Sequence, residues 1–386
     1  MPRKSLFRSV HRLPRVGVLA AAALALSASL AAIDVAAQVQ PAIQQRLDTV
    51  REQLFSGTGR PDRSIQELKA ILAIDPGSAE GHLLLGIAYR TAGSSDLMGE
   101  AVAELRQALA LNDKYVPARF YLAHLYLDLG RPERAREELQ AALAQSPQNP
   151  QFMALLGETE RQLRNPARAV ELTRDALKVD PAFDESRYYL GLALFDLGRR
   201  DEAIAELERV VQAQPRLVDP YLSLGTAYLE AERFDDALRV LRIGAQVDPA
   251  NPEVRIQLAR AYRSKGALDS AEAQLKLAVP NANGALAASQ FQHQKVEFDL
   301  DFERAMITFR RGRLELAGAA FRKVLETDSN HGPAHRYLAE VYLQQGRFAR
   351  AEEHAARAEQ LGAPLPAVKR KLIQQKLGKQ EPGARQ

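Results

Sequence analysis

A spacing of 34 residues constrains the fold of this chain more than any other feature. It separates successive alanines and, in the same stretch, successive prolines. A period of this length is typical of helical repeat arrays, in which each repeat buries its apolar face against its neighbours. Such an array offers an extended surface instead of one enclosed active site. The alanines are Ala101, Ala135, Ala169, Ala203, Ala237 and Ala271, and the prolines are Pro147, Pro181, Pro215 and Pro249.

One unit, Pro150–Phe183, shows how the pattern predicts two packed helices. Its seventh and eighth residues are Leu156 and Gly157, and its twentieth is Ala169. Large and small residues three or four apart mark one face of an amphipathic helix. The small residues let a second helix approach closely, so we expect helix crossings at the eighth and twentieth positions. Ala203 should therefore sit in a crossing, whereas Glu206 should be exposed on the same helix.

The fifteenth position predicts the turn between the two helices. Glycine there permits the left-handed conformation that ends a helix. Two units carry Arg164 and Glu232 instead, and Asn165 is the expected turn residue in the first of them. Pro132 and Pro166 follow at the seventeenth position, which suits the first turn of the next helix. The glycines are Gly130, Gly198, Gly266, Gly312 and Gly346.

These residues resemble the consensus of the tetratricopeptide repeat (TPR) family. The match is clearest at Leu85-Gly86 with Tyr89 and at Leu224-Gly225 with Tyr228. The resemblance implies an all-α fold, a right-handed α-solenoid of helix-turn-helix TPR units. It also implies a binding scaffold that is not an enzyme and needs no cofactor. The complete units are 79–115, 116–149, 150–183, 184–217, 218–251, 252–285, 298–331 and 332–365.

The repeats suggest a domain organisation with one irregular junction. A signal peptide over 1–37 and a divergent N-terminal repeat or cap over 38–78 precede six units over 79–285. An insert and two further units follow over 286–365, and a capping helix with a tail closes the chain over 366–386. Ala271 and Ala317 lie 46 residues apart, 12 more than the repeat, which places the insert near Asn281–Phe298. It is either a functional loop or part of a long packing helix over Leu286–Phe309.

The N-terminus resembles an export signal. Five basic residues between Arg3 and Arg15 precede an apolar run from Val16 to Ala32, and Val35-Ala36-Ala37 offers a cleavage site after Ala37. An uncleaved inner-membrane anchor is the alternative. We therefore expect a periplasmic location. The chain has no cysteine, which excludes disulfides, thiolate metal sites and cysteine nucleophiles.

Charge argues against nucleic acid as a partner. The whole chain has 52 basic and 48 acidic side chains, and removing residues 1–37 leaves 47 of each. Without an overall basic field, binding to phosphate backbones is not expected. Membrane contact is expected only through the signal or anchor, or through the basic C-terminal segment Pro366–Leu377.

No motif points to catalysis or to a metal. Phosphate-binding glycine loops, nucleophile elbows and zinc-protease helices are absent from the sequence. His331 and His335 are four residues apart, but Gly332 and Pro333 lie between them, so both are interpreted as surface histidines. We predict no catalytic, cofactor or metal residues.

The resemblance places the first helix of each unit along a concave groove. Aromatic residues and arginines are favoured in interface hot spots, so those facing the groove are candidate partner-binding residues. The competing interpretation is that the family uses aromatics at these positions for packing. The asparagines with which some TPR domains clamp a C-terminal carboxylate are missing. The candidates are Phe120, Tyr121, His124, Arg161, Tyr188, Tyr189, Phe195, Arg260, Arg263, Phe302 and Phe309.

Two functions agree with the sequence. The first is an exported scaffold or adaptor for protein–protein interactions in envelope assembly, secretion or polysaccharide export, with an extended or helical partner segment in the groove. The second is direct binding of a polysaccharide or another non-protein ligand in the aromatic groove. If the aromatics are surface residues, replacing Tyr188 and Phe195 by alanine should leave stability nearly unchanged.

Overall fold

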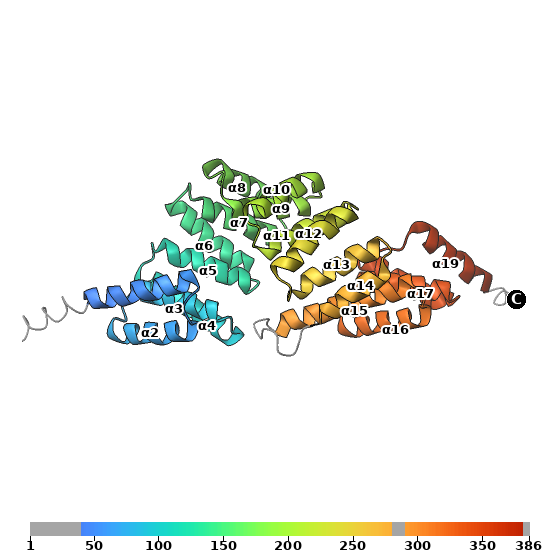
Figure 1. Cartoon of the computed structure of the whole chain (residues 1–386), viewed down its shortest axis with the longest axis horizontal. Coiled ribbons are helices and arrows are strands. Elements are labelled where there is room, and N and C mark those ends of the chain that lie inside the picture. The colour runs from blue at the N-terminus through green and yellow to red at the C-terminus, as the bar shows by residue number, and fades with distance from the viewer. Residues whose placement is uncertain (1–39, 280–289, 381–386) are drawn as a thin grey trace, which may run out of the picture. The chain divides into compact units, whose positions relative to one another are not determined.

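The computed structural model describes residues 40–279 and 290–380, and all regular structure in these ranges is helical (Figure 1). The expected signal peptide lies outside the described residues, as do 280–289 of the insert and the tail from 381. No helix in the described ranges is long and apolar enough to cross a membrane. The chain divides into two compact units, 1–125 and 126–386. We describe each by itself.

The first unit contains the expected N-terminal helices and the first complete repeat. A helix over 40–56 buries Ile43, Leu47 and Val50. It is followed by α2 (Pro61–Ile74), α3 (Ala79–Ala92) and α4 (Ser95–Leu111). The boundary with the second unit falls within α5 (Val116–Asp128).

The second unit continues the helical pairs, and from α6 to α19 each helix packs against the next (Figure 1). This arrangement confirms the predicted all-α solenoid. The helices are α6 (Pro132–Gln145), α7 (Pro150–Gln162), α8 (Pro166–Val179), α9 (Asp184–Asp196), α10 (Arg200–Ala213), α11 (Val218–Glu230), α12 (Phe234–Val247), α13 (Pro252–Ser264), α14 (Leu268–Leu277), α15 (Gln290–Arg310), α16 (Leu314–Thr327), α17 (Gly332–Gln344), α18 (Phe348–Gln360) and α19 (Ala367–Gln380).

Small residues hold the paired helices close together. Ala203 and Ala237 are fully buried. A Cβ atom built on Gly225 would lie 2.5 Å from the Leu241 side chain, which is too close for any other residue without movement of that leucine. The eighth and twentieth positions are therefore the helix crossings that the repeat predicted.

The turn between α7 and α8 differs from the prediction. Arg164 itself is left-handed, with φ 63°, and Glu232 has φ 56° at the same position of its unit. Asn165 has φ −110° and is not the turn residue. The geometry is imposed by the helix ending, because Asn165 N–H donates to Glu160 O at 2.8 Å, as Arg233 N–H donates to Tyr228 O. The Arg164 and Glu232 side chains are both exposed, so these residues adopt the left-handed backbone without help from side-chain packing.

We expect Arg164→Gly and Glu232→Gly each to raise the free energy of unfolding. A left-handed conformation costs an L-residue roughly 1–2 kcal/mol, and the greater freedom of glycine in the unfolded chain offsets part of this, which leaves a gain of about 0.5–1 kcal/mol. Urea denaturation measures it. Ala205→Gly, at an exposed position inside α10, should instead lower stability by about 1 kcal/mol. Loss of stability in the Arg164 and Glu232 variants would contradict the turn assignment.

The insert junction is held together by the long helix α15. Its first half buries Val296 and Leu300 against α13 and α14. Its second half buries Ala305 and Met306 against α16, α17 and α18. The described part of the insert thus serves packing, as one of the two interpretations proposed.

The C-terminal helix α19 docks by both apolar and charged contacts. Ile373 is fully buried. Lys369 Nζ donates to Glu340, and Arg370 Nη1 lies 2.6 Å from Glu352 Oε2. Two of the basic residues expected to make a membrane-surface patch are therefore turned toward the repeats.

Candidate functional site

Three candidate residues in the first unit form an aromatic cluster. On α5, the Phe120 ring centroid lies 4.6 Å from that of His124 and 5.6 Å from that of Tyr121. Phe55, from the helix over 40–56, lies 6.3 Å from Tyr121 and is 55% exposed. Phe55 was not among the candidates, because its helix matches the repeat poorly. Burial raises the pKa of the Tyr121 hydroxyl, and Arg90 opposes this rise.

Arg161 is engaged within the protein. Its guanidinium bonds both carboxylate oxygens of Glu158, at 2.8 and 2.9 Å, and Asp196 Oδ2 at 2.9 Å. The hydrogen bonds that Arg161 donates to Glu158 are the main cause of its raised pKa. This network joins α7 to α9, so Arg161 reaches a partner only by giving up these bonds.

Arg260 and Arg263 both bind one buried carboxylate. Glu303 on α15 has a side chain that is 1% exposed, and its oxygens lie 2.9 Å from Arg260 Nε and 2.8 Å from Arg263 Nε. Glu303 holds the sixth position of its unit, and Arg260 holds the ninth position of the preceding unit. The positions where a clamp would bind a ligand carboxylate are thus occupied by an internal one.

Three of the candidate phenylalanines pack against the core. Phe195 contacts the apolar clusters on both sides of α9. Phe302 and Phe309 are partly buried around Phe321, with ring centroids 6.1 and 6.4 Å from it. Removal of Phe195 would leave a cavity, so the expected tolerance of the Tyr188 and Phe195 double variant is revised. For these residues the structure favours the packing interpretation.

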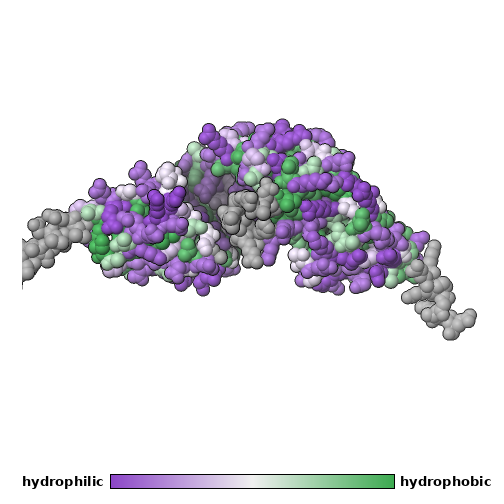
Figure 2. Space-filling view, turned by 60° about the horizontal axis from the view of Figure 1, so that its bottom comes forward, coloured by the Kyte–Doolittle hydropathy of each residue, from purple (hydrophilic) through white to green (hydrophobic). Residues whose placement is uncertain are grey.

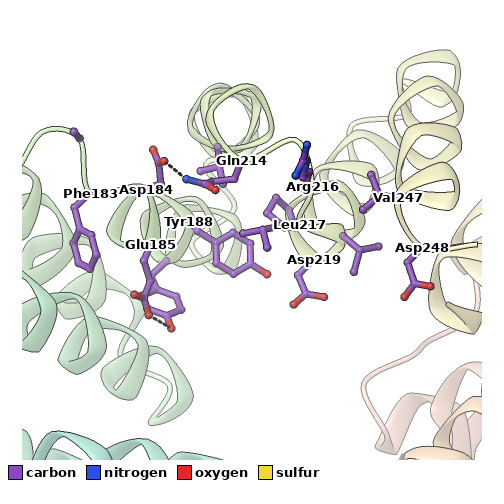
Figure 3. A pocket seen from close by; sticks show the side chains of 15 residues that line it. Phe183, Asp184, Glu185, Tyr188, Gln214, Arg216, Leu217, Asp219, Val247 and Asp248 are labelled. Atoms are coloured by element: carbon purple, nitrogen blue, oxygen red, sulfur yellow. Dashed lines mark hydrogen bonds between the residues drawn. The ribbon is translucent and has the colours of Figure 1, made fainter. Parts of the chain in front are cut away.

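Tyr188 and Tyr189 line a pocket of about 830 Å³ in the second unit. The Tyr188 hydroxyl lies 3.1 Å from Ser223 Oγ, and the Tyr189 hydroxyl donates to Glu185 Oε1 at 3.0 Å. Burial is the main cause of the raised pKa of both hydroxyls. Figure 3 shows Tyr188, Leu217 and Asp219 close together in this space. We call it the Tyr188 pocket; its lining includes Phe183, Asp184, Glu185, Gln214, Arg216, Leu217, Asp219, Val247 and Asp248.

Two apolar residues in this lining occupy helix N-caps. Asn149 and Asn251 cap α7 and α13 with side-chain hydrogen bonds. At the same repeat position α9 has Phe183 and α11 has Leu217, and neither makes a side-chain cap. An apolar N-cap in place of asparagine costs about 1 kcal/mol. Tyr115 stands at the same position before α5, outside the pocket, so the departure marks a functional surface only where it coincides with a pocket, as at Phe183 and Leu217.

On the face shown in Figure 2, hydrophobic residues form separate small patches among hydrophilic ones. The predicted groove residues thus divide into a cluster on the first unit, core packing, internal ion pairs and the Tyr188 pocket. The pocket is the strongest site in the second unit, since it combines aromatic rings, open volume and uncapped helix ends.

His331 and His335 make hydrogen bonds with different partners, and both are half-buried, so the prediction that they are surface histidines is wrong. His331 Nδ1 accepts from Ala334 N–H at 3.3 Å and caps α17. His335 Nε2 donates to Ser329 O at 3.1 Å, and its Nδ1 shares a hydrogen bond with His354 Nδ1, 2.8 Å away. Within residues 40–279 and 290–380, no three His, Cys, Asp or Glu side chains are grouped to hold a metal ion.

We expect mild acid to destabilise this end of the array. Burial is the main cause of lowered pKa values at His331 and His354, and repulsion from His335 adds to both. The unfolded chain, in which histidine titrates near about 6.5, then takes up protons before the folded chain. The stability that the neutral His331 and His354 side chains contribute is present above about pH 6.5, and it is lost as the pH falls toward their lowered pKa values in the folded protein.

Urea midpoints at about pH 7.5 and about pH 5.5 bracket this titration while most carboxylates stay ionised. The midpoint of the wild type should fall between them. His331→Asn with His354→Gln keeps a capping side chain and a hydrogen-bonding amide but cannot titrate, so its midpoint should fall less. An equal fall in both proteins would show that other groups dominate.

Comparison with known proteins agrees with this architecture. Tetratricopeptide repeat family profiles match residues 133–282, and also 98–158 and 309–371. No curated protein matches the chain.

Solved structures share this fold, among them the following two. A chain of the APC/C hetero-tetramer Cut9–Hcn1 is 14% identical with a TM-score of 0.60, over 82% of this chain and 59% of that one. A tetratricopeptide repeat protein from Parabacteroides merdae is 17% identical with a TM-score of 0.53, over 67% and 99% of the two chains. This chain thus spans 59% of the length of the first. With the 34-residue period, the paired helices and the matching profiles in agreement, the chain belongs to the tetratricopeptide repeat family.

Proposed function

We propose that this protein is an exported scaffold of the cell envelope that binds a protein partner through the Tyr188 pocket and catalyses no reaction. The tetratricopeptide fold implies a scaffold for protein–protein interaction. The observation that carries the choice of surface is the pair of apolar N-caps, Phe183 and Leu217, beside Tyr188. An aromatic anchor in such a pocket is the usual centre of a binding hot spot.

Site-specific crosslinking tests the surface. A photoreactive amino acid replaces Leu217, which is 52% exposed in the pocket, and in a control protein it replaces Leu316, which is 61% exposed on α16. After irradiation of cells, position 217 should yield one discrete adduct with an envelope protein, and Tyr188→Ala should reduce it. An adduct of equal yield from position 316, or no adduct from 217, would refute the pocket as the binding site.

The export part rests on the sequence of residues 1–37. Mass spectrometry of the native protein should find a mature N-terminus near Gln38, with the protein in the periplasmic fraction. Membrane-bound protein that retains Met1 would instead establish the anchor, with the repeats still on the periplasmic side. Intact protein in the cytoplasm would refute export.

A further inference from the structure

The lining of the Tyr188 pocket is strongly acidic. It holds four carboxylates and one guanidinium, that of Arg216. Asp184 and Glu185 begin α9, Asp219 lies in the first turn of α11, and Asp248 is the C-cap of α12. Figure 3 shows these charged groups around Tyr188 and Leu217. The pocket therefore combines aromatic and aliphatic walls with an excess of negative charge.

These carboxylates make no ion pair with any residue that the structure describes. Asp184 accepts from Gln214 Nε2 at 2.9 Å, Glu185 from the Tyr189 hydroxyl at 3.0 Å, and Asp248 from Ala250 N–H at 3.2 Å. Each of these donors is neutral. Among the residues that line the pocket, Arg216 alone carries a positive charge to set against the four carboxylates.

Acidic residues in the same repeats are neutralised differently. Glu206 pairs with Arg187 and Arg209, and Asp236 pairs with Arg233 and Arg239. The arginines of these repeats thus pair with carboxylates that lie outside the pocket lining. Desolvation, helped by Glu253, raises the pKa of the Asp219 carboxyl, so a cation placed beside it would stabilise its charge.

We propose that the Tyr188 pocket binds an arginine-bearing segment of the partner protein, which rests on the proposed function and names the chemistry of its partner. A guanidinium stacks on an aromatic face and pairs with a carboxylate through two parallel hydrogen bonds, which a lysine ammonium cannot do. Tyr188 supplies the ring, Asp219 and Asp248 supply the charge, and Leu217 and Val247 contact the aliphatic part of the segment. This polarity is opposite to that of a clamp for a C-terminal carboxylate.

Acidic residues in the first turn of a helix also stabilise the helix through its dipole. If this is their only role, removing these acidic residues should change the melting temperature and leave peptide binding unchanged. The two roles are separated by a matched control, because Asp201 has the same place in α10 that Asp219 has in α11, is exposed, and lies outside the pocket lining. Asp201→Asn and Asp219→Asn therefore remove the same charge from the same helical position.

The test uses the mature protein and three fluorescein-labelled peptides. The peptides share one sequence of glycine, leucine and proline residues and differ only in their charged residues, which are several arginines in the first, lysines in the second and glutamates in the third. Fluorescence anisotropy should rank arginine above lysine, with no binding of the glutamate peptide. Asp219→Asn should weaken binding of the arginine peptide about fivefold, since one solvent-accessible ion pair contributes up to that factor. Arg216→Ala should strengthen it by a similar factor, whereas Asp201→Asn should leave it unchanged.

Two results would overturn the proposal. Equal weakening by Asp201→Asn and Asp219→Asn would show nonspecific attraction to a basic peptide. Preference for the glutamate peptide would show that the pocket binds with the opposite chemistry. The crosslink from position 217 separates this proposal from the broader one: an adduct that persists while the arginine peptide fails to bind leaves the scaffold function standing and removes only the arginine assignment.

Discussion

Glu303→Ala should lower the free energy of unfolding by about 3 kcal/mol or more, the largest effect that we expect from a single substitution. The Glu303 side chain is 1% exposed and holds Arg260 and Arg263 on α13. Removing one member of a buried ion pair leaves the remaining charges desolvated and unpaired. Arg263 is the more affected, since its side chain is only 11% exposed. Chemical denaturation followed by circular dichroism measures the loss.

Glu326→Ala on α16 is the control for helix propensity and charge, because Glu326 is exposed. It should change stability by less than about 0.5 kcal/mol. Replacing Arg260 and Arg263 by methionine together with Glu303→Met should recover much of the lost stability, because an apolar set of similar volume needs no compensating charge. A Glu303→Ala protein as stable as the wild type would show that the arginines find other partners.

Ala203→Leu should destabilise the protein by about 1–3 kcal/mol through overpacking. Ala203 is 0% exposed in the crossing of α9 and α10, where a Cβ atom built on Gly191 would lie only 2.8 Å from the Leu207 side chain. A leucine has no free volume there, so the helices must separate or the side chain must adopt a strained rotamer. Thermal melting of the two proteins gives the difference.

The matched control for Ala203→Leu is Ala205→Leu, the same change at an exposed position of α10. Glu206, which the repeat predicted to be exposed, is unsuitable. Its side chain is only 19% exposed and pairs with Arg187 at 3.1 Å and Arg209 at 2.9 Å. Equal melting of the two leucine variants would show that Ala203 is not in a crossing.

Positions governed by helix geometry were predictable from the sequence. A 34-residue recurrence of Ala203 and its equivalents specifies a crossing, because only small side chains allow such close approach. The left-handed turn at Arg164 was not predictable. The preference for glycine at the fifteenth repeat position does not show whether the helix ending forces another residue into the same conformation. There the hydrogen bond from Asn165 N–H to Glu160 O determines the backbone.

The candidate site was harder to predict, because a repeat position gives the direction of a side chain and not its partner. The repeat position of Arg260 did not indicate that the carboxylate that holds it comes from Glu303, beyond the insert. A signal for the pocket was nevertheless present in the sequence. Phe183 and Leu217 stand where Asn149 and Asn251 cap their helices, a departure visible from the aligned repeats alone.

The pairing of Arg260 and Arg263 with Glu303 also limits where the array can gain or lose repeats during evolution. Where neighbouring repeats present the same alanine and leucine surfaces, one repeat can be duplicated or deleted and the new neighbours still fit. The junction between α13 and α15 does not allow this exchange, because α15 must meet a helix with arginines in the two places of Arg260 and Arg263. Repeat-number variants of this protein should therefore gain or lose units outside the 252–331 segment, and keep that segment as one inherited block.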